Sequence, residues 1–132
     1  MQLKAYQRAL LVLVVLITAT PAFSAGVVVQ DQGEYREAMK NARPGEVIKL
    51  ANGTWNDFEI LFKGEGAEDS PITLTAEEKG KVILSGQSSL RLAGKHLVVS
   101  GLVFKDGYTP TGEVISFRRN KDDLAYYSRV TE

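Results

Sequence analysis

The sequence lacks cysteine altogether and contains a single histidine and a single tryptophan among its 132 residues. The absence of cysteine excludes disulfide bonds, thiolate metal sites and a cysteine nucleophile. Neither charge is in excess, because 16 Lys and Arg residues balance 16 Asp and Glu residues. The net charge therefore gives no indication of a nucleic-acid partner, and no acidic tail indicates a disordered binding segment.

Long apolar runs are also lacking, with one exception near the N-terminus. The run ALLVLVVLITA at 9–19 follows the basic residues Lys4 and Arg8, and Pro21 and the stretch 22–25, with the small residues Ala22, Ser24 and Ala25, come after it. This order is typical of a secretory signal peptide, whereas the competing interpretation, a membrane anchor, needs an apolar span of about 20 residues. We expect residues 1–25 to be a cleaved signal peptide and the mature protein to be exported to the periplasm, outer surface or medium, with no membrane attachment.

Helical periodicity is limited to one segment of the mature chain. Asp31 stands where a helix N-cap is expected, three residues before Glu34. Apolar side chains then recur at the spacing of a single helical face, at Tyr35, Ala38, Met39 and Ala42. The Arg-Pro-Gly that follows at 43–45 does not continue a helix. The sequence therefore predicts one short amphipathic helix at 32–42.

After Gly45 the sequence consists of short β-branched runs separated by turn residues. The runs lie at 47–50, 58–62, 72–76, 81–86, 90–94, 97–99, 102–104 and 113–117, and another is centred on Val130. They are about three to five residues long, which is short for strands. Only Ser100 and Gly101 separate the runs at 97–99 and 102–104, so we expect two consecutive strands with a corner between them.

Similar apolar positions recur along the chain, at Ile48, Ile72 and Val98. A period of this length is typical of a solenoid in which each coil carries about three short strands. We therefore expect an all-β fold, a right-handed parallel β-helix whose first coil is capped by the helix at 32–42. An antiparallel β-sandwich or jelly roll is the alternative, because such folds also have short strands at regular spacing.

Two stretches resemble a known family of proteins. The stretch PGEVIKLANGTW at 44–55 resembles the entry to many secreted β-helix carbohydrate enzymes. The stretch at 70–107, from SPITLTA to LVFKDG, looks like the N-terminal coils of polysaccharide lyase family 6, which contains alginate lyases and chondroitinase B. The resemblance implies a right-handed β-helix of the pectin-lyase type that cleaves uronic-acid polysaccharides by β-elimination. It also implies a calcium ion, a lysine base and an arginine acid in later coils.

The resemblance provides no catalytic or metal-binding residue within this chain, because the matching residues of the family lie in later coils. We therefore expect the catalytic residues downstream of Glu132, the last residue of the sequence. The chain ends at a strand, with no terminal helix or polar cap. Residues 26–132 are accordingly expected to be the N-terminal part of a longer lyase domain, truncated at its C-terminus and inactive alone.

The resemblance also indicates the kind of substrate. The expected substrate is an anionic polysaccharide, alginate first and dermatan or chondroitin sulfate second. The alternative is a non-catalytic β-helix surface protein, either an adhesin or a carbohydrate-binding module.

Candidates for substrate binding lie near the C-terminus. Arg118, Arg119 and Lys121 follow a predicted strand, where binding loops are often found, and Tyr126 lies just beyond them. The pair Asp122-Asp123 offsets much of this positive charge, and two adjacent carboxylates are weak evidence for a calcium site. A solvated loop is the competing interpretation of this segment.

The remaining polar and aromatic residues favour structural roles. His96 stands where a turn enters a strand, and no second catalytic group converges with it in the sequence, so we expect a turn residue. Trp55, Tyr126 and Tyr127 are residue types that stack on sugar rings, but they are more typical here of corner or core positions.

Overall fold

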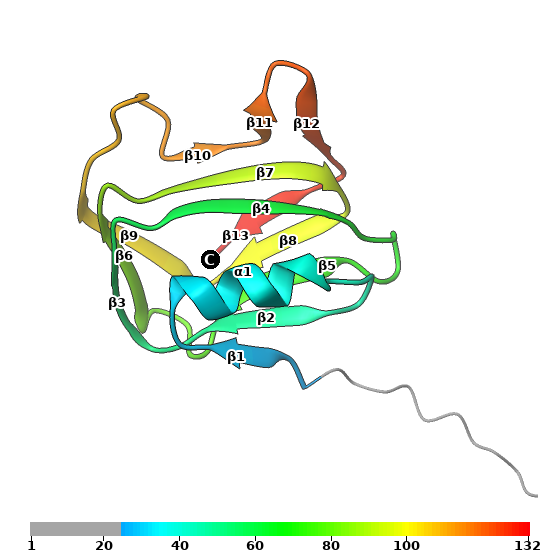
Figure 1. Ribbon diagram of the computed structural model, residues 1–132, viewed down its shortest axis with the longest axis horizontal. Coiled ribbons are helices and arrows are strands. Elements are labelled where there is room, and N and C mark those ends of the chain that lie inside the picture. The colour runs from blue at the N-terminus through cyan, green and yellow to red at the C-terminus, as the bar shows by residue number, and fades with distance from the viewer. Residues whose placement is uncertain (1–24) are drawn as a thin grey trace, which may run out of the picture.

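The computed structural model describes residues 25–132 (Figure 1). The signal peptide expected at 1–25 lies, apart from Ala25, outside the described residues and stays a prediction. Over residues 25–132, no helix is long and apolar enough to cross a membrane.

Three sheets form the body of the fold, and the strands of one coil pair with those of the next. Sheet A contains β1 (Val27–Val29), β2 (Val47–Leu50), β5 (Ile72–Ala76), β8 (Leu97–Ser100) and β13 (Arg129–Thr131), in that order. Sheet B contains β3 (Gly53–Asn56), β6 (Val82–Gly86) and β9 (Leu102–Gly107). Sheet C contains β4 (Glu59–Glu65), β7 (Ser89–Lys95), β10 (Ile115–Ser116), β12 (Asp123–Tyr126) and β11 (Arg118–Asn120).

The pairing within these sheets decides between the two folds that the sequence allowed. Of the strand pairs within residues 25–132, only β11 with β12 is antiparallel, and all the others are parallel. A β-sandwich or jelly roll requires antiparallel neighbours, so that alternative is wrong. Successive strands pass from sheet A to B to C and back, as in a parallel β-helix.

The corner predicted at Ser100–Gly101 is confirmed. Strand β8 belongs to sheet A and β9 to sheet B, and Gly101 between them has a φ of 73°. This left-handed conformation is accessible to glycine at little cost, so the chain turns from one sheet into the next within a single residue.

The register of sheet A corrects the predicted repeat. Ile48 pairs with Leu74, and Leu74 pairs with Val99, so Ile72 and Val98 are not the counterparts of Ile48. Ile48, Leu74 and Val99 are each at most 1% exposed, and they form one inward-facing row. Because side chains alternate between the two faces of a strand, a shift of one residue exchanges a core position for a surface position.

The core is a column of aliphatic and aromatic side chains inside the coils. Essentially inaccessible side chains include Phe62, Ile60, Leu90 and Leu92 from the inner face of sheet C. Full burial of such a side chain contributes about 1.5–3 kcal/mol. The interior of the coils therefore supplies most of the stabilisation.

Helix α1 (Gln32–Lys40) ends two residues before the predicted boundary. Asp31 is the N-cap, as predicted, and its side chain accepts a 2.8 Å hydrogen bond from the Glu34 N–H. At the other end, Asn41 is the C-cap and leaves the helical conformation ahead of Pro44. The predicted apolar face is confirmed, because Tyr35 is buried and Ala38, Met39 and Ala42 pack against the core.

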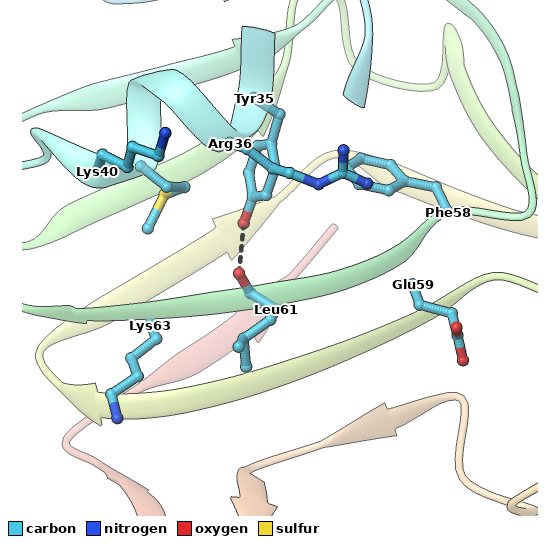
Figure 2. Close-up of a pocket in the computed structure, with 8 residues that line it drawn as sticks. Tyr35, Arg36, Lys40, Phe58, Glu59, Leu61 and Lys63 are labelled. Atoms are coloured by element: carbon cyan, nitrogen blue, oxygen red, sulfur yellow. Dashed lines mark hydrogen bonds between the residues drawn. The ribbon is translucent and has the colours of Figure 1, made fainter. Parts of the chain in front are cut away.

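Side chains of α1 bond to the backbone of the first coil. The Tyr35 hydroxyl donates a 2.9 Å hydrogen bond to the carbonyl of Leu61 in β4 (Figure 2). Burial raises the pKa of the Tyr35 phenol far above its ordinary value, so the hydroxyl keeps its proton. Gln32 donates to the carbonyls of Asn56 and Asp57. Within residues 25–132 no strand other than β7 pairs with β4, so the Tyr35 hydroxyl satisfies one carbonyl of a bare strand edge, whereas Gln32 bonds to the end of β3 and the turn after it.

The hydroxyl of Tyr35 is expected to contribute measurably to stability. Tyr35→Phe keeps the ring, which packs edge-on against Phe58, but leaves the half-buried Leu61 carbonyl without its donor. We expect a loss of about 1–2 kcal/mol in the free energy of unfolding. Urea denaturation checks this, with the exposed Arg43→Ala as control. Equal stability of Tyr35→Phe and the parent would mean that the bond is not formed in solution.

Candidate substrate-binding site

The segment expected to be a loop, 118–126, is a β-hairpin built on sheet C. Strands β11 and β12 pair antiparallel, and β12 continues sheet C through the pairs of Ala125 with Gly94 and Tyr126 with Lys95. Strand β10 pairs with the other end of β7, through Leu90 and Arg91. Figure 1 shows the hairpin projecting beyond β7. Arg118 and Arg119 therefore lie on a paired strand, although their side chains are exposed, whereas Lys121 lies in the hairpin turn.

Asp123 fastens the hairpin to sheet C. Its Oδ2 lies 2.8 Å from the Lys63 Nζ and 2.8 Å from the Arg119 Nε. The hydrogen bond from Lys63 is the main reason that the pKa of Asp123 lies below its usual value, and the charge of Arg119 acts in the same direction. Asp123 is thus a partner of two cations, and we find no support for its role as a calcium ligand.

A pocket of about 180 Å³ opens beside the hairpin. Its lining consists of Arg91, Thr111, Glu113, Ser116, Arg118 and Arg119. We refer to it as the arginine pocket. Arg91 projects from the outer face of β7, opposite Ser116 of β10. Sequence reasoning missed Arg91, because only the alternation within the run at 90–94 distinguishes it as an outward-facing residue.

Glu113 is the single carboxylate of the arginine pocket. Its Oε1 lies 3.0 Å from the Arg118 Nη2. Hydrogen bonds from Ser116 and Arg118, in that order, hold the pKa of Glu113 below its usual value. Three guanidinium groups against one carboxylate leave a net positive charge around the pocket. Guanidinium groups bind carboxylates through paired hydrogen bonds, so the pocket suits the acidic group of a uronic acid.

The structure brings only some of the predicted residues together. Arg118 and Arg119 line the arginine pocket, whereas Lys121 lies exposed in the hairpin turn and Tyr126 lies exposed at the end of β12. Neither Lys121 nor Tyr126 contributes to the lining. The predicted cluster therefore contains two residues of one pocket and two residues of the surrounding surface.

The other singled-out residues behave largely as structural groups. Trp55 is buried, stacks on Phe58 and donates from Nε1 to the Ala51 carbonyl at 3.0 Å. His96 is a turn residue, as predicted, with a φ of 50°. Its ring stacks on that of Tyr127, which occupies the equivalent corner of the next coil and is 79% exposed. The expectation of a corner position is met for Tyr127, but neither Tyr126 nor Tyr127 is a core residue.

No set of residues for the expected calcium ion is present in the part of the chain that the structure describes. Over residues 25–132, no group of three or more histidine, aspartate or glutamate side chains is arranged to hold a metal ion. The described coils therefore do not fit a calcium site, and we derive no chemical step from one.

Glu132, beyond which the catalytic residues are expected, is itself a surface group. Its Oε2 lies 3.4 Å from the Lys79 Nζ, and both side chains are largely exposed. An exposed ion pair of this kind contributes little to stability, and no further titratable group joins it among the ion pairs of residues 25–132. The location of the base and the acid downstream of Glu132 stays a prediction.

The docking of the hairpin is expected to depend on pH through Asp123. The pKa of Asp123 is lower in the folded protein than in the unfolded chain. The ion pairs of Asp123 therefore stabilise the docked hairpin fully above about pH 4, the ordinary pKa of an aspartate. This stabilisation is lost as the pH falls through the lower pKa that Asp123 has in the folded protein. We expect the hydrogen-exchange protection factors of β12 amides to fall in this acid range.

The adjacent aspartate provides a matched control for this prediction. Asp123→Asn is expected to lower the protection of β12 at neutral pH and to remove its acid dependence. Asp122→Asn is expected to change neither, because Asp122 forms none of the ion pairs found over residues 25–132. Identical behaviour of the two variants would contradict the proposed fastening by Asp123.

Comparison with known proteins gives a consistent result. Residues 29–132 match the family model described as chondroitinase B. The structure of the polysaccharide lyase family 6 alginate lyase AlyGC is similar, with 64% sequence identity, a TM-score of 0.79 and coverage of 80% of this chain and 15% of that one. No curated protein sequence matches significantly.

Two further solved structures are similar to the chain. A mannuronic-acid-specific family 6 lyase from human gut microbiota is 28% identical, with a TM-score of 0.69 over 80% of this chain and 25% of that one. A family 6 polysaccharide lyase from Pseudopedobacter saltans is 43% identical, with a TM-score of 0.60 over 61% of this chain and 19% of that one. The chain thus spans at most a quarter of the length of these enzymes.

Proposed function

The chain belongs to the chondroitinase B family, and from this premise we propose that it forms the first coils of an exported polysaccharide lyase that cleaves alginate by β-elimination. The observation that carries the proposal is the 64% identity to an alginate lyase over 80% of this chain. Dermatan or chondroitin sulfate is the second choice, because the family model bears the name chondroitinase B, whereas AlyGC is an alginate lyase and the enzyme from human gut microbiota is specific for mannuronic acid.

The reaction sets clear requirements for the site. The carboxylate of the uronate must be neutralised, so that the proton on C5 becomes acidic. A base removes this proton, the C5–H electron pair forms the C4=C5 double bond, and the C4–O bond breaks as an acid protonates the leaving oxygen. Of these requirements, the residues of this chain are suited to binding the carboxylates of uronate residues.

We propose that the arginine pocket holds such a carboxylate at one of the bound sugars. Arg91 and Arg118 supply the guanidinium groups, and Arg119 keeps the hairpin in place through Asp123. Lys121 and Tyr126 lie on the exposed surface of the hairpin and would contact longer stretches of the polysaccharide. None of these residues is assigned as the base or the acid.

The fold that we propose for the whole domain is a right-handed parallel β-helix with α1 as the cap of its first coil. The hydrogen bonds from Tyr35 and Gln32 to first-coil carbonyls support the capping role. Export is proposed from the residues at 1–25, and the small residues Ala22, Ser24 and Ala25 favour cleavage near Ala25.

The test is an elimination assay on the whole protein. Cleavage produces an unsaturated uronate, so turnover of alginate is followed by the rise in ultraviolet absorbance, with dermatan sulfate as the comparison substrate. We expect turnover of alginate by the whole protein and no turnover by the purified chain of 132 residues, because the described residues bring no base, acid and carboxylate-binding group together. Binding of alginate without turnover by the whole protein would favour the non-catalytic surface protein.

A further inference from the structure

A second cavity, of about 450 Å³, lies between α1 and β4 at the start of the coils (Figure 2). We refer to it as the α1–β4 groove. Arg36 and Lys40 come from the helix, whereas Lys63 and Glu59 come from the strand. Three cations and one carboxylate therefore line the groove. Lys40 is paired with Glu37 and Lys63 with Asp123, so Arg36 is the cation of this lining that has no ion pair among residues 25–132.

The floor of the α1–β4 groove is apolar. Met39 and Leu61 contribute to its lining, and the backbone carbonyl of Leu61 is already bonded to the Tyr35 hydroxyl. Leu61 is 40% exposed, so part of this apolar surface is in contact with water. An apolar floor with cations at the rim matches a uronic acid, whose ring presents C–H groups and whose carboxylate is charged.

One row of paired residues links the α1–β4 groove to the arginine pocket. Leu61 of β4 pairs with Arg91 of β7, and Arg91 pairs with Ser116 of β10. Leu61 lines the groove and Arg91 lines the pocket, and both side chains are exposed, whereas Ser116 at the end of the row is buried. Neighbouring strands lie about 4.8 Å apart, so this row spans roughly 10 Å, about two sugar residues. Lys63 connects the groove to the hairpin beside the arginine pocket, because it lines the groove and bonds to Asp123.

From these observations we propose that the α1–β4 groove is a second binding point for the anionic polysaccharide, reached from the arginine pocket along the row Leu61–Arg91–Ser116. The inference rests on the proposed function, since it assigns a further contact to the same substrate. Charge complementarity supports it, because no carboxylate within the described residues forms an ion pair with Arg36. Its guanidinium donates a hydrogen bond to the amide oxygen of Gln32 at 3.4 Å.

The existing ion pairs at the rim do not prevent such binding. Lys40 is paired with Glu37, but their side chains are 66% and 68% exposed. Exposed pairs of this kind contribute little in water, so a uronate carboxylate can replace Glu37 at small cost. Arg36 and Lys40 are also surface positions of the helix, where a substitution by alanine leaves the fold intact.

The experiment measures equilibrium binding of mannuronate oligosaccharides of defined length to the whole protein by calorimetry, at a pH and temperature at which the ultraviolet assay detects no cleavage. A disaccharide bound in the arginine pocket extends along the row no further than Leu61, whereas an octasaccharide reaches Arg36 and Lys40 on the helix side of the α1–β4 groove. We expect Arg36→Ala to weaken octasaccharide binding about 3-fold and Arg36→Glu about 10-fold, with less than about 2-fold effects on the disaccharide. The matched control, Arg43→Ala, removes an exposed arginine beyond the helix and is expected to change neither affinity.

The outcomes separate this inference from the proposed function. Octasaccharide binding that is unchanged in Arg36→Glu, or weakened equally for both lengths, overturns the assignment of the groove while the proposed function stands. Failure of the parent protein to bind any uronate oligosaccharide, or to cleave alginate, overturns the proposed function itself, and this inference with it.

Discussion

Gly94→Ala is expected to destabilise the fold by more than about 4 kcal/mol, enough to prevent folding of a domain of ordinary stability. Gly94 pairs with Gly64 of the preceding coil, and its φ is +110°, a conformation that other residues rarely adopt. A Cβ atom at Gly94 would collide with the carbonyl oxygen of Gly64. Because both partners are backbone of a parallel ladder, the coils would have to separate to make room.

A substitution at a second glycine, Gly80, distinguishes the effect of the steric collision from the effect of the left-handed backbone conformation. Gly80 also has a positive φ, of +79°, but an added Cβ there meets no atom within 4 Å. Gly80→Ala should therefore cost only about 1–2 kcal/mol, which is the strain of the left-handed conformation. Urea denaturation followed by circular dichroism measures both variants. If the two variants have similar free energies of unfolding, the backbones at Gly64 and Gly94 are not in close contact in solution.

The double variant Arg91→Ala/Arg118→Ala is expected to weaken binding of alginate oligosaccharides by the whole protein about 10- to 100-fold. The variant removes two of the three guanidinium groups of the arginine pocket. It also leaves Glu113 without its partner Arg118, so that the remaining carboxylate repels the uronate. Asp123 keeps both Lys63 and Arg119, and the hairpin should stay in place.

The control for the double variant keeps the same change in net charge. Lys81→Ala/Lys105→Ala removes two exposed lysines that line neither the arginine pocket nor the α1–β4 groove. Calorimetry with an alginate oligosaccharide and the ultraviolet assay are the measurements. If the lysine pair has as large an effect as the arginine pair, binding depends on overall charge and not on this pocket.

Much of the fold could be predicted from local features of the sequence. The N-cap at Asp31, the apolar face that starts at Tyr35 and the corner at Gly101 each depend on a few neighbouring residues, and all three are confirmed. Strand β3 was missed because Asn52-Gly53 is typical of a turn, although Gly53 already pairs with Val82. The hairpin of β11 and β12 was missed because its charged residues resemble those of a solvated loop.

The sequence by itself determined the helix, most of the strands, the corners between them and the resemblance to a family of lyases, since each of these depends on a short stretch of the chain. Which residues come together in the candidate site was decided only by the tertiary structure. Lys63 and Asp123 are 60 residues apart in sequence, and Arg91 meets Arg118 only because β10 and β12 pair with opposite ends of β7. The register between coils depends on how all the inward-facing side chains pack together. A shift of the register by one residue would move Arg91 from the pocket into the core. No local pattern in the sequence predicts which register the strands adopt.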